Sequence, residues 1–251
     1  MTSPQLTYYN MNARVVAFSS TRQGGCSTGN YAAFNVNAYC GDSDEHIAQN
    51  RASLCRLLGI GTERLVMPHQ VHGCEVRRVD GPPSEPIEGA DAVMTNVGGL
   101  CIGVSTADCI PILLYDEAHH AACAVHAGWR GTVQRIAERA VEAMHRDYGT
   151  EAARLQAVIG PGISLDSFEV GDEVYDQFAA AGFDMAAISR HDAKWHIDLP
   201  ECNRRQLMAV GVPAAHIQSA AICTYCHHDR YFSARRLGIQ SGRILTGILL
   251  K

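Results

Sequence analysis

The chain has 251 residues, of which 47% are hydrophobic and 19% are charged, values typical of a globular protein with a substantial core. Its formal net charge of -5 argues against a nucleic acid or an anionic membrane surface as a partner, because both bind proteins with a basic face. Residues 1–20 lack the basic and apolar regions of a secretion signal, and no later segment is apolar for long enough to cross a bilayer, so we expect a cytoplasmic protein.

Short apolar runs rich in β-branched residues predict strands along the whole chain. They span Arg14–Thr21, Arg64–His69, Glu75–Val79, Ala92–Thr95, Ile102–Thr106, Ile110–Tyr115, Ala121–His126, Leu155–Ile159 and Ile244–Leu250. Several are apolar throughout, which indicates burial on both faces. Helical periodicity predicts helices at Asp44–Leu58, Thr132–Tyr148, Asp172–Ala180 and Glu201–Val210.

The order of these elements indicates the fold class. Strands outnumber helices, and several follow one another without room for a crossover helix, for example between Gly89 and Gly128. This favours a mixed-sheet α+β fold over a regular doubly wound one. No repeat, low-complexity tract or charge run marks a linker, so residues 1–251 are predicted to form a single catalytic domain. The ten cysteines are interpreted mostly as buried thiols, with a metal ligand or a nucleophile among them.

Three short segments carry the residues best suited to chemistry. They are PHQVHGCEV at 68–76, STADCIPILL at 105–114 and AVHAGWRGT at 124–132. Each places a cysteine or histidine near the end of a predicted strand, where a rigid strand fixes the residue and a loop gives access. One cysteine and two histidines match the three protein ligands of catalytic zinc, which leave a fourth position for water or substrate. We therefore predict that His72, Cys109 and His126 hold one catalytic zinc ion.

At this point the sequence resembles the YfiH-type proteins, also called laccase-domain proteins. The resemblance spans nearly the whole chain, through STRQGG at 20–25, FNVNAYCGD at 34–42, the three segments above, IGPGI at 159–163, FEVGDEV at 168–174 and CTY at 223–225. It implies a layered α/β/β/α fold and the same three zinc ligands. It also implies purine nucleoside phosphorylase and adenosine deaminase activities, with adenosine, inosine, guanosine or methylthioadenosine and phosphate as small-molecule substrates.

The residue types suit both activities. Zinc lowers the pKa of a bound water and so supplies a nucleophile for deamination of adenosine. Phosphorolysis needs donors that hold phosphate, such as an arginine fork or backbone N–H groups. Arg130 precedes the helix predicted from Thr132, so its guanidinium and that helix N-terminus are expected to share an anion. Arg22 and Arg51 are further candidates for binding substrate.

Two more residues near the expected ligands have predicted roles. Asp108 precedes Cys109 and is expected to act in catalysis by orienting a metal-bound histidine or the substrate; the alternative is a buried carboxylate that caps a turn. His69 lies three residues before His72, a spacing that on a strand turns it to the opposite face. We interpret His69 as a packing residue or as a support for the site, and not as a ligand.

Other function classes fit the same residues. In a cysteine hydrolase, Cys109 would be the nucleophile, activated by His126 or His72. The resemblance connects such amide hydrolysis, by cysteine or by zinc, with editing of peptidoglycan precursors. Copper can take the place of zinc at nitrogen and sulfur ligands, so a secondary polyphenol oxidase activity is a further alternative, although the HxH pairs of multicopper oxidases are absent. A zinc-stabilised binding module ranks last. The oligomeric state is not indicated.

The segment CTYCH at 223–227 matches the attachment pattern of c-type haem and half of a zinc ribbon. Neither interpretation fits a cytoplasmic chain that has no second CxxC. Cys226, His227 and His228 depart from the family pattern. We favour a redox role for Cys223 and Cys226 over a separate metal site.

Overall fold

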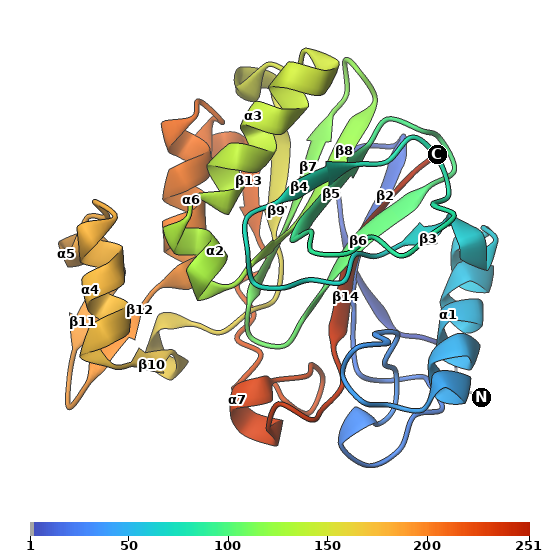
Figure 1. The fold of residues 1–251 in the computed structure, drawn as a ribbon, viewed down its shortest axis with the longest axis horizontal. Coiled ribbons are helices and arrows are strands. Elements are labelled where there is room, and N and C mark those ends of the chain that lie inside the picture. The colour runs from blue at the N-terminus through green and yellow to red at the C-terminus, as the bar shows by residue number, and fades with distance from the viewer. Residues whose placement is uncertain (1–2) are drawn as a thin grey trace.

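The computed structural model describes residues 3–251, and within them the two larger sheets form the centre of the fold (Figure 1). The first has five strands in the order β1 (Leu6–Tyr9), β2 (Val15–Ser20), β14 (Ile244–Leu250), β6 (Cys101–Thr106) and β3 (Leu65–Val66). The second has six, in the order β13 (Ile217–Ser219), β9 (Gln156–Ile159), β7 (Ile110–Asp116), β8 (Ala121–Ala127), β5 (Ala92–Thr95) and β4 (Val76–Arg78). Both sheets mix parallel and antiparallel pairs, as the α+β prediction requires.

The two sheets pack face to face because alternate residues of their strands are apolar on the inner side. Ile102 and Val104 of β6 share one buried cluster with Leu113 and Tyr115 of β7. The intervening residues of the same strands, such as Ile112 of β7, point outward and are also buried. Continuous apolar runs in the sequence therefore correspond to strands that are covered on both faces.

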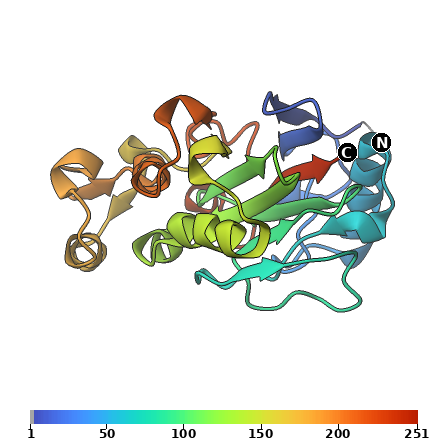
Figure 2. The same cartoon turned by 90° about the horizontal axis from the view of Figure 1, so that it is seen from above.

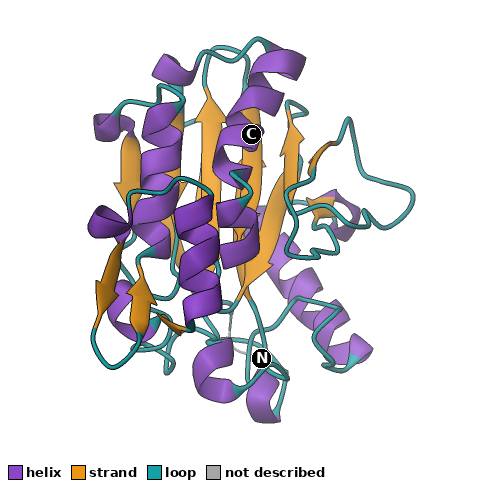
Figure 3. Ribbon diagram, turned by 60° about the vertical axis from the view of Figure 1, so that its left-hand side comes forward, coloured by secondary structure: helices purple, strands orange, loops and turns teal. Residues whose placement is uncertain are grey.

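Helices cover the outer face of each sheet. Helix α1 (Asp44–Leu58) places Leu54 against Phe18 and Leu245 of the five-stranded sheet. Helices α3 (Ile136–Tyr148) and α6 (Leu199–Ala209) pack on the outer face of the six-stranded sheet. In Figure 3 these helices lie in front of the strands. The predicted α+β fold with α/β/β/α layers is confirmed.

A small third sheet lies beside these layers and was not predicted. It contains β10 (Glu169–Val170), β12 (Trp195–Ile197) and β11 (Ser189–His191), next to α4 (Asp172–Ala180) and α5 (Met185–Ile188). Figure 2 shows this region at the far left, away from the two large sheets. Strands of two or three residues show no recognisable alternation. The short helix α7 (Ala234–Leu237) and 3₁₀ helices at Gly29–Tyr31, Thr62–Arg64, Ala152–Arg154, Leu165–Ser167 and Ala214–His216 complete the described elements.

The predicted helix Thr132–Tyr148 is two helices, so this prediction was wrong at its start and in its continuity. Helix α2 (Trp129–Val133) begins before Thr132, and α3 starts again at Ile136. Arg135 between them has a φ of 65°, a left-handed conformation that ends regular helix. Its guanidinium donates to Glu138 Oε1 at 3.0 Å and to the Ala181 carbonyl at 2.9 Å. These contacts stabilise the interruption between the two helices, and local periodicity does not reveal them.

The β7–β8 hairpin positions the candidate site. The two strands pair antiparallel, with Ile110 opposite Ala127 and Pro111 opposite His126. Cys109 immediately precedes β7, so the pairing places it beside the end of β8 that carries His126. Among the described residues, no helix is both long and apolar enough to span a bilayer.

Candidate metal centre

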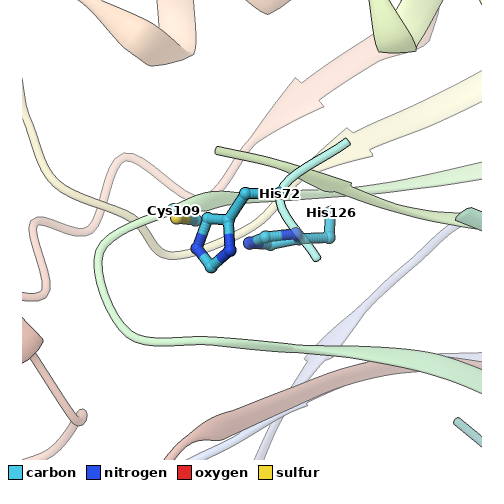
Figure 4. A group of neighbouring side chains, drawn as sticks. All are labelled: His72, Cys109 and His126. Atoms are coloured by element: carbon cyan, nitrogen blue, oxygen red, sulfur yellow. The ribbon is translucent and has the colours of Figure 1, made fainter. Parts of the chain in front are cut away.

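The structure brings His72, Cys109 and His126 together from three separate segments (Figure 4). His72 lies in the loop between β3 and β4, Cys109 precedes β7, and His126 belongs to β8. Their nitrogen and sulfur ligand atoms all lie within 4.8 Å of one another. The two imidazole rings meet edge to face, with centroids 4.8 Å apart. His126 is buried, Cys109 is half-buried and His72 is exposed, so the group is open on one side.

The donor set fits the predicted zinc ion. Two imidazoles and a thiolate are ligands that zinc prefers, and three protein ligands leave one coordination position for another molecule. Gly128, directly after β8, lies against the three side chains. A Cβ atom at Gly128 would lie 3.1 Å from His72 Cδ2, 3.2 Å from Cys109 Sγ and 3.6 Å from His126 Cε1. A side chain there would therefore press on His72 and Cys109.

Cys109 and His126 stabilise each other's charged forms in the metal-free protein. Burial raises the pKa of the Cys109 thiol, but the charge and hydrogen bonds of His126 and His72 outweigh it and bring the pKa to about 6. Burial likewise lowers the pKa of His126, but the Cys109 thiolate and the Asp91 carboxylate raise it to about 9. Opposite charges in close contact produce these shifts. The pair is therefore a thiolate and an imidazolium at neutral pH.

This pairing predicts a pH dependence of metal binding. Above pH 6 Cys109 is already a thiolate, whereas His126 keeps its proton until about pH 9. A metal ion that binds His126 in this interval must release that proton. We expect the zinc affinity to rise by about tenfold per pH unit across the interval, as measured by competition with a chromophoric chelator. An affinity independent of pH would contradict the charged pair.

One buried carboxylate, Asp91, supports both histidines of the candidate ligand group. Its Oδ1 accepts the Nδ1–H of His126 at 2.7 Å and the backbone N–H of His72 at 2.9 Å. Its Oδ2 accepts the N–H of Gly73 at 2.7 Å. The Nδ1 bond leaves the other ring nitrogen of His126 for the metal. Although burial raises the pKa of Asp91, the hydrogen bond and charge of His126 bring it below its usual value.

Asp91 also holds the backbone of the ligand loop. His72 has a φ of 61°, a left-handed conformation that is unfavourable for a residue with a side chain and persists only when its surroundings enforce it. The carboxylate does so through the N–H groups of His72 and Gly73. Asp91 was not predicted from the sequence. Its one signal is an acidic residue at the start of a buried apolar strand, in GADAV at 89–93.

The Asp108 carboxylate has different partners from those expected. Its Oδ1 accepts the hydroxyl of Thr224 at 2.7 Å, and its Oδ2 accepts the backbone N–H of Arg235 at 2.7 Å. Both oxygens are therefore bonded to the segments that follow β13, and the contact to a ligand histidine is made by Asp91. This arrangement matches the alternative interpretation of Asp108 as a carboxylate that organises a turn.

A cavity of about 310 Å³ opens in front of the three ligands, within the size range of small-molecule sites. Besides the ligands it is lined by Asn37, Tyr39, Cys40, His69, Gln70, Ser105, Thr106, Ala107, Ala234, Ile239 and Arg243. The rings of Tyr39 and His69 are stacked, with centroids 3.9 Å apart. Ser105 Oγ and Thr106 Oγ1 are buried and have no hydrogen-bond partner within residues 3–251. The cavity thus offers an aromatic surface, whereas the Ser105 and Thr106 hydroxyl oxygens are covered.

His69 lies on the same cavity as His72, so the expectation that it turns to the opposite face was wrong. Strand β3 ends at Val66, and the alternation of a strand does not apply to the loop that follows. Nδ1 of His69 lies 2.6 Å from Glu88 Oε2. The residue is not part of the ligand group, in agreement with the sequence interpretation on that point.

None of the three predicted arginines lines the cavity. Arg130 is exposed and stacks on Trp129, with its guanidinium carbon 4.3 Å from the ring centroid. Because α2 begins at Trp129, Arg130 lies within the helix and not before it. Arg22 donates to the carbonyls of Ala32 and His228. Arg51 donates to the carbonyl of Val36 at 2.8 Å.

The arginine that does line the cavity is Arg243, which was not predicted from the sequence. Its guanidinium donates to the carbonyls of Ser241 at 2.6 Å and Ile239 at 2.9 Å. These bonds fix the side chain at the cavity wall. Arg243 lies just before β14, far in sequence from the ligand segments, and nothing in its sequence context distinguished it from other arginines.

The chain is similar to known proteins over most of its length. Residues 16–251 match a family described as multi-copper polyphenol oxidoreductase laccase. The chain is 47% identical to a purine nucleoside phosphorylase of Bacteroides thetaiotaomicron, over 93% of this chain and 90% of that protein. It is 44% identical to adenosine deaminase RL5 from an unknown prokaryotic organism, over 94% of each chain. The crystal structure of YlmD from Geobacillus stearothermophilus superposes with a TM-score of 0.92 at 30% identity, covering 97% of this chain and 94% of that one.

Proposed function

The chain belongs to the multi-copper polyphenol oxidoreductase laccase family, and we propose that within it the protein acts as a zinc-dependent purine nucleoside enzyme. It is an enzyme of the purine nucleoside phosphorylase and adenosine deaminase type. The reactions proposed are phosphorolysis of adenosine, inosine, guanosine and methylthioadenosine, and deamination of adenosine. The observation that carries the proposal is the group of His72, Cys109 and His126 on the wall of a cavity. The similarity to a purine nucleoside phosphorylase and to an adenosine deaminase supports it.

The protein's own residues have separable roles in this proposal. His72, Cys109 and His126 hold the metal, which when bound supplies a Lewis acid and lowers the pKa of water. Asp91 orients the imidazole of His126 and holds the backbone N–H of His72. The stacked Tyr39 and His69 offer a face on which a purine base can lie.

The polar groups of the cavity complete the proposed substrate site. The guanidinium of Arg243 provides the positive charge that suits a phosphate ion.

Replacing Arg243 tests its proposed role against that predicted for Arg130. We expect Arg243→Met to raise the KM for phosphate by about tenfold to a hundredfold, the usual value of a hydrogen bond to a charged group. Arg130→Met, the matched control, should leave this KM unchanged because Arg130 does not line the cavity. Deamination of adenosine uses no phosphate and should survive in both variants. A change of the phosphate KM in Arg130→Met alone would contradict this assignment.

The proposed function is tested by incubating the zinc-loaded protein with adenosine, with and without phosphate, and separating the products by chromatography. Adenine that forms only with phosphate establishes phosphorolysis, and inosine that forms without it establishes deamination. Adenosine that stays unchanged under both conditions would contradict the proposal.

A second candidate function, a cysteine hydrolase, rests on the line of contacts from Asp91 through His126 to Cys109. The carboxylate bonds His126 Nδ1 at 2.7 Å, and the imidazole holds the pKa of the Cys109 thiol at about 6. This is the arrangement of an activated thiolate nucleophile. A covalent acyl adduct on Cys109 of the metal-free protein would favour this function. A thiolate that stays inert in the zinc-loaded protein favours the metal enzyme.

A further inference from the structure

Cys223 and Cys226 lie outside the metal centre on one tight turn. The His227 N–H donates to the Cys223 carbonyl at 3.0 Å, and the Tyr231 N–H donates to the His227 carbonyl at 2.9 Å. This helix-like winding brings residues three apart to the same side of the turn. Cys223 is half-buried and Cys226 is exposed, and both are free thiols in the structure. The first sulfur is therefore shielded while the second is open to solvent.

Both sulfur atoms contact the same hydroxyl group. Ser167 Oγ lies 3.5 Å from Cys223 Sγ and 3.7 Å from Cys226 Sγ. The two sulfurs thus converge on one point across the turn. The backbone N–H of Ser164 also donates to Cys223 Sγ, at 3.5 Å. Hydrogen-bond donors that surround a sulfur atom stabilise its thiolate form.

The surroundings distinguish Cys223 from the cysteines of the core. Burial raises the pKa of Cys223, but hydrogen bonds from Ser164, Ser167 and the Cys226 backbone outweigh it and bring the pKa to about 7. In contrast, burial raises the pKa of the Cys55 thiol to about 11. A large fraction of Cys223 is therefore thiolate at neutral pH, the form that attacks disulfides.

We propose that Cys223 and Cys226 form a redox-active dithiol that exchanges reversibly with small-molecule disulfides. A cavity of about 360 Å³, lined by Ser164, Ile222 and Cys223 among others, gives such a molecule access to Cys223. The pair is a site of thiol chemistry in its own right, and this inference does not depend on the proposed nucleoside activity.

The exchange proceeds in two balanced steps. The Cys223 thiolate attacks one sulfur of the small disulfide, whose S–S bond breaks and releases one small thiolate. Cys226 then loses its proton to solvent and attacks Sγ of Cys223 in the mixed disulfide, which releases the second small thiolate. The two cysteines lose two electrons in total, and the small disulfide gains them and takes up two protons as two thiols.

The turn is also connected to the metal centre. Thr224 lies between the two cysteines, is buried, and donates its hydroxyl to Asp108 Oδ1 at 2.7 Å. Asp108 directly precedes the proposed ligand Cys109. The test of the dithiol uses the full chain loaded with zinc, because bound zinc protects the Cys109 thiolate from reaction with the disulfide.

The test incubates this protein with bis(hydroxyethyl) disulfide, blocks the remaining thiols and maps disulfides by peptide mass spectrometry. We expect a Cys223–Cys226 disulfide that dithiothreitol reverses. In Cys226→Ser the mixed disulfide on Cys223 should accumulate, because nothing resolves it. Cys223→Ser should form neither product at this turn. Cys74→Ser, a change of a half-buried cysteine elsewhere, should behave as the unchanged protein.

Two outcomes would overturn the proposal. One is a protein that forms only stable mixed disulfides and never links Cys223 to Cys226. The other is an ordinary pH dependence of the rate at which iodoacetamide alkylates Cys223, a rate that mass spectrometry measures at each pH. This rate should be half-maximal near pH 7. A midpoint at the pH of an ordinary thiol would show that Cys223 is not activated.

Discussion

Cys109→Ala is expected to abolish metal retention and nucleoside turnover together. The substitution removes the one anionic ligand of the group and leaves two imidazoles. We expect zinc affinity to fall on the order of a hundredfold to a thousandfold, as the loss of one of a few strong ligands implies, and turnover to fall to background. Metal content after dialysis and product formation from adenosine measure the two effects.

Cys74→Ala is the matched control for this variant. Cys74 is also half-buried and lies two residues after the candidate ligand His72, but it is not part of the candidate ligand group. It should keep both metal and activity. Thermal unfolding of both variants shows whether the fold is intact. Full activity in a metal-free Cys109→Ala protein would contradict the role of the ligand group.

Asp91→Asn is expected to weaken zinc binding without removing a ligand. The amide cannot accept at both positions, so His126 and the His72–Gly73 backbone lose part of their support. Loss of such an outer carboxylate usually costs about tenfold to a hundredfold in metal affinity. Competition with a chelator measures this loss, and turnover at saturating zinc shows whether the geometry recovers.

A matched control lies at the end of the β7–β8 hairpin that is far from the metal centre. Asp116 is also buried, accepts the Nδ1–H of His119 at 2.7 Å and accepts the N–H of Ala118 at 2.9 Å. Asp116→Asn therefore breaks the same kind of hydrogen bonds away from the metal centre. It should lower stability without lowering zinc affinity. Equal losses of zinc affinity in the two variants would show that Asp91 acts only through the stability of the fold.

Much of the fold could be predicted because its elements are strongly patterned. Strands β5 and β14 and helices α1 and α4 have the predicted bounds. Helix α1 ends where expected because Gly59 adopts a φ of 72°, which glycine does at little cost. The break at Arg135 and the strands of the small sheet depend on contacts with distant residues, which a local pattern does not contain.

The candidate site shows the same division. The three candidate ligands could be proposed from sequence because one cysteine and two histidines, each near a predicted strand, form the donor set of catalytic zinc, and because the family resemblance implies the same three residues. Asp91 lies 35 residues before His126 and reaches it only because β5 pairs with β8, with Ala92 opposite Val125. Arg243 reaches the cavity only through the path of the chain before β14. Residues that support or complete a site therefore depend on tertiary pairing.

The central claim is that one metal ion at His72, Cys109 and His126 makes the protein active. Its most direct test removes metal with a chelator, adds zinc back in known amounts and follows the products formed from adenosine with phosphate. We predict no turnover without metal and a linear rise that stops at about one ion per chain, the capacity of one three-ligand group. Full turnover in the metal-free protein would contradict the claim.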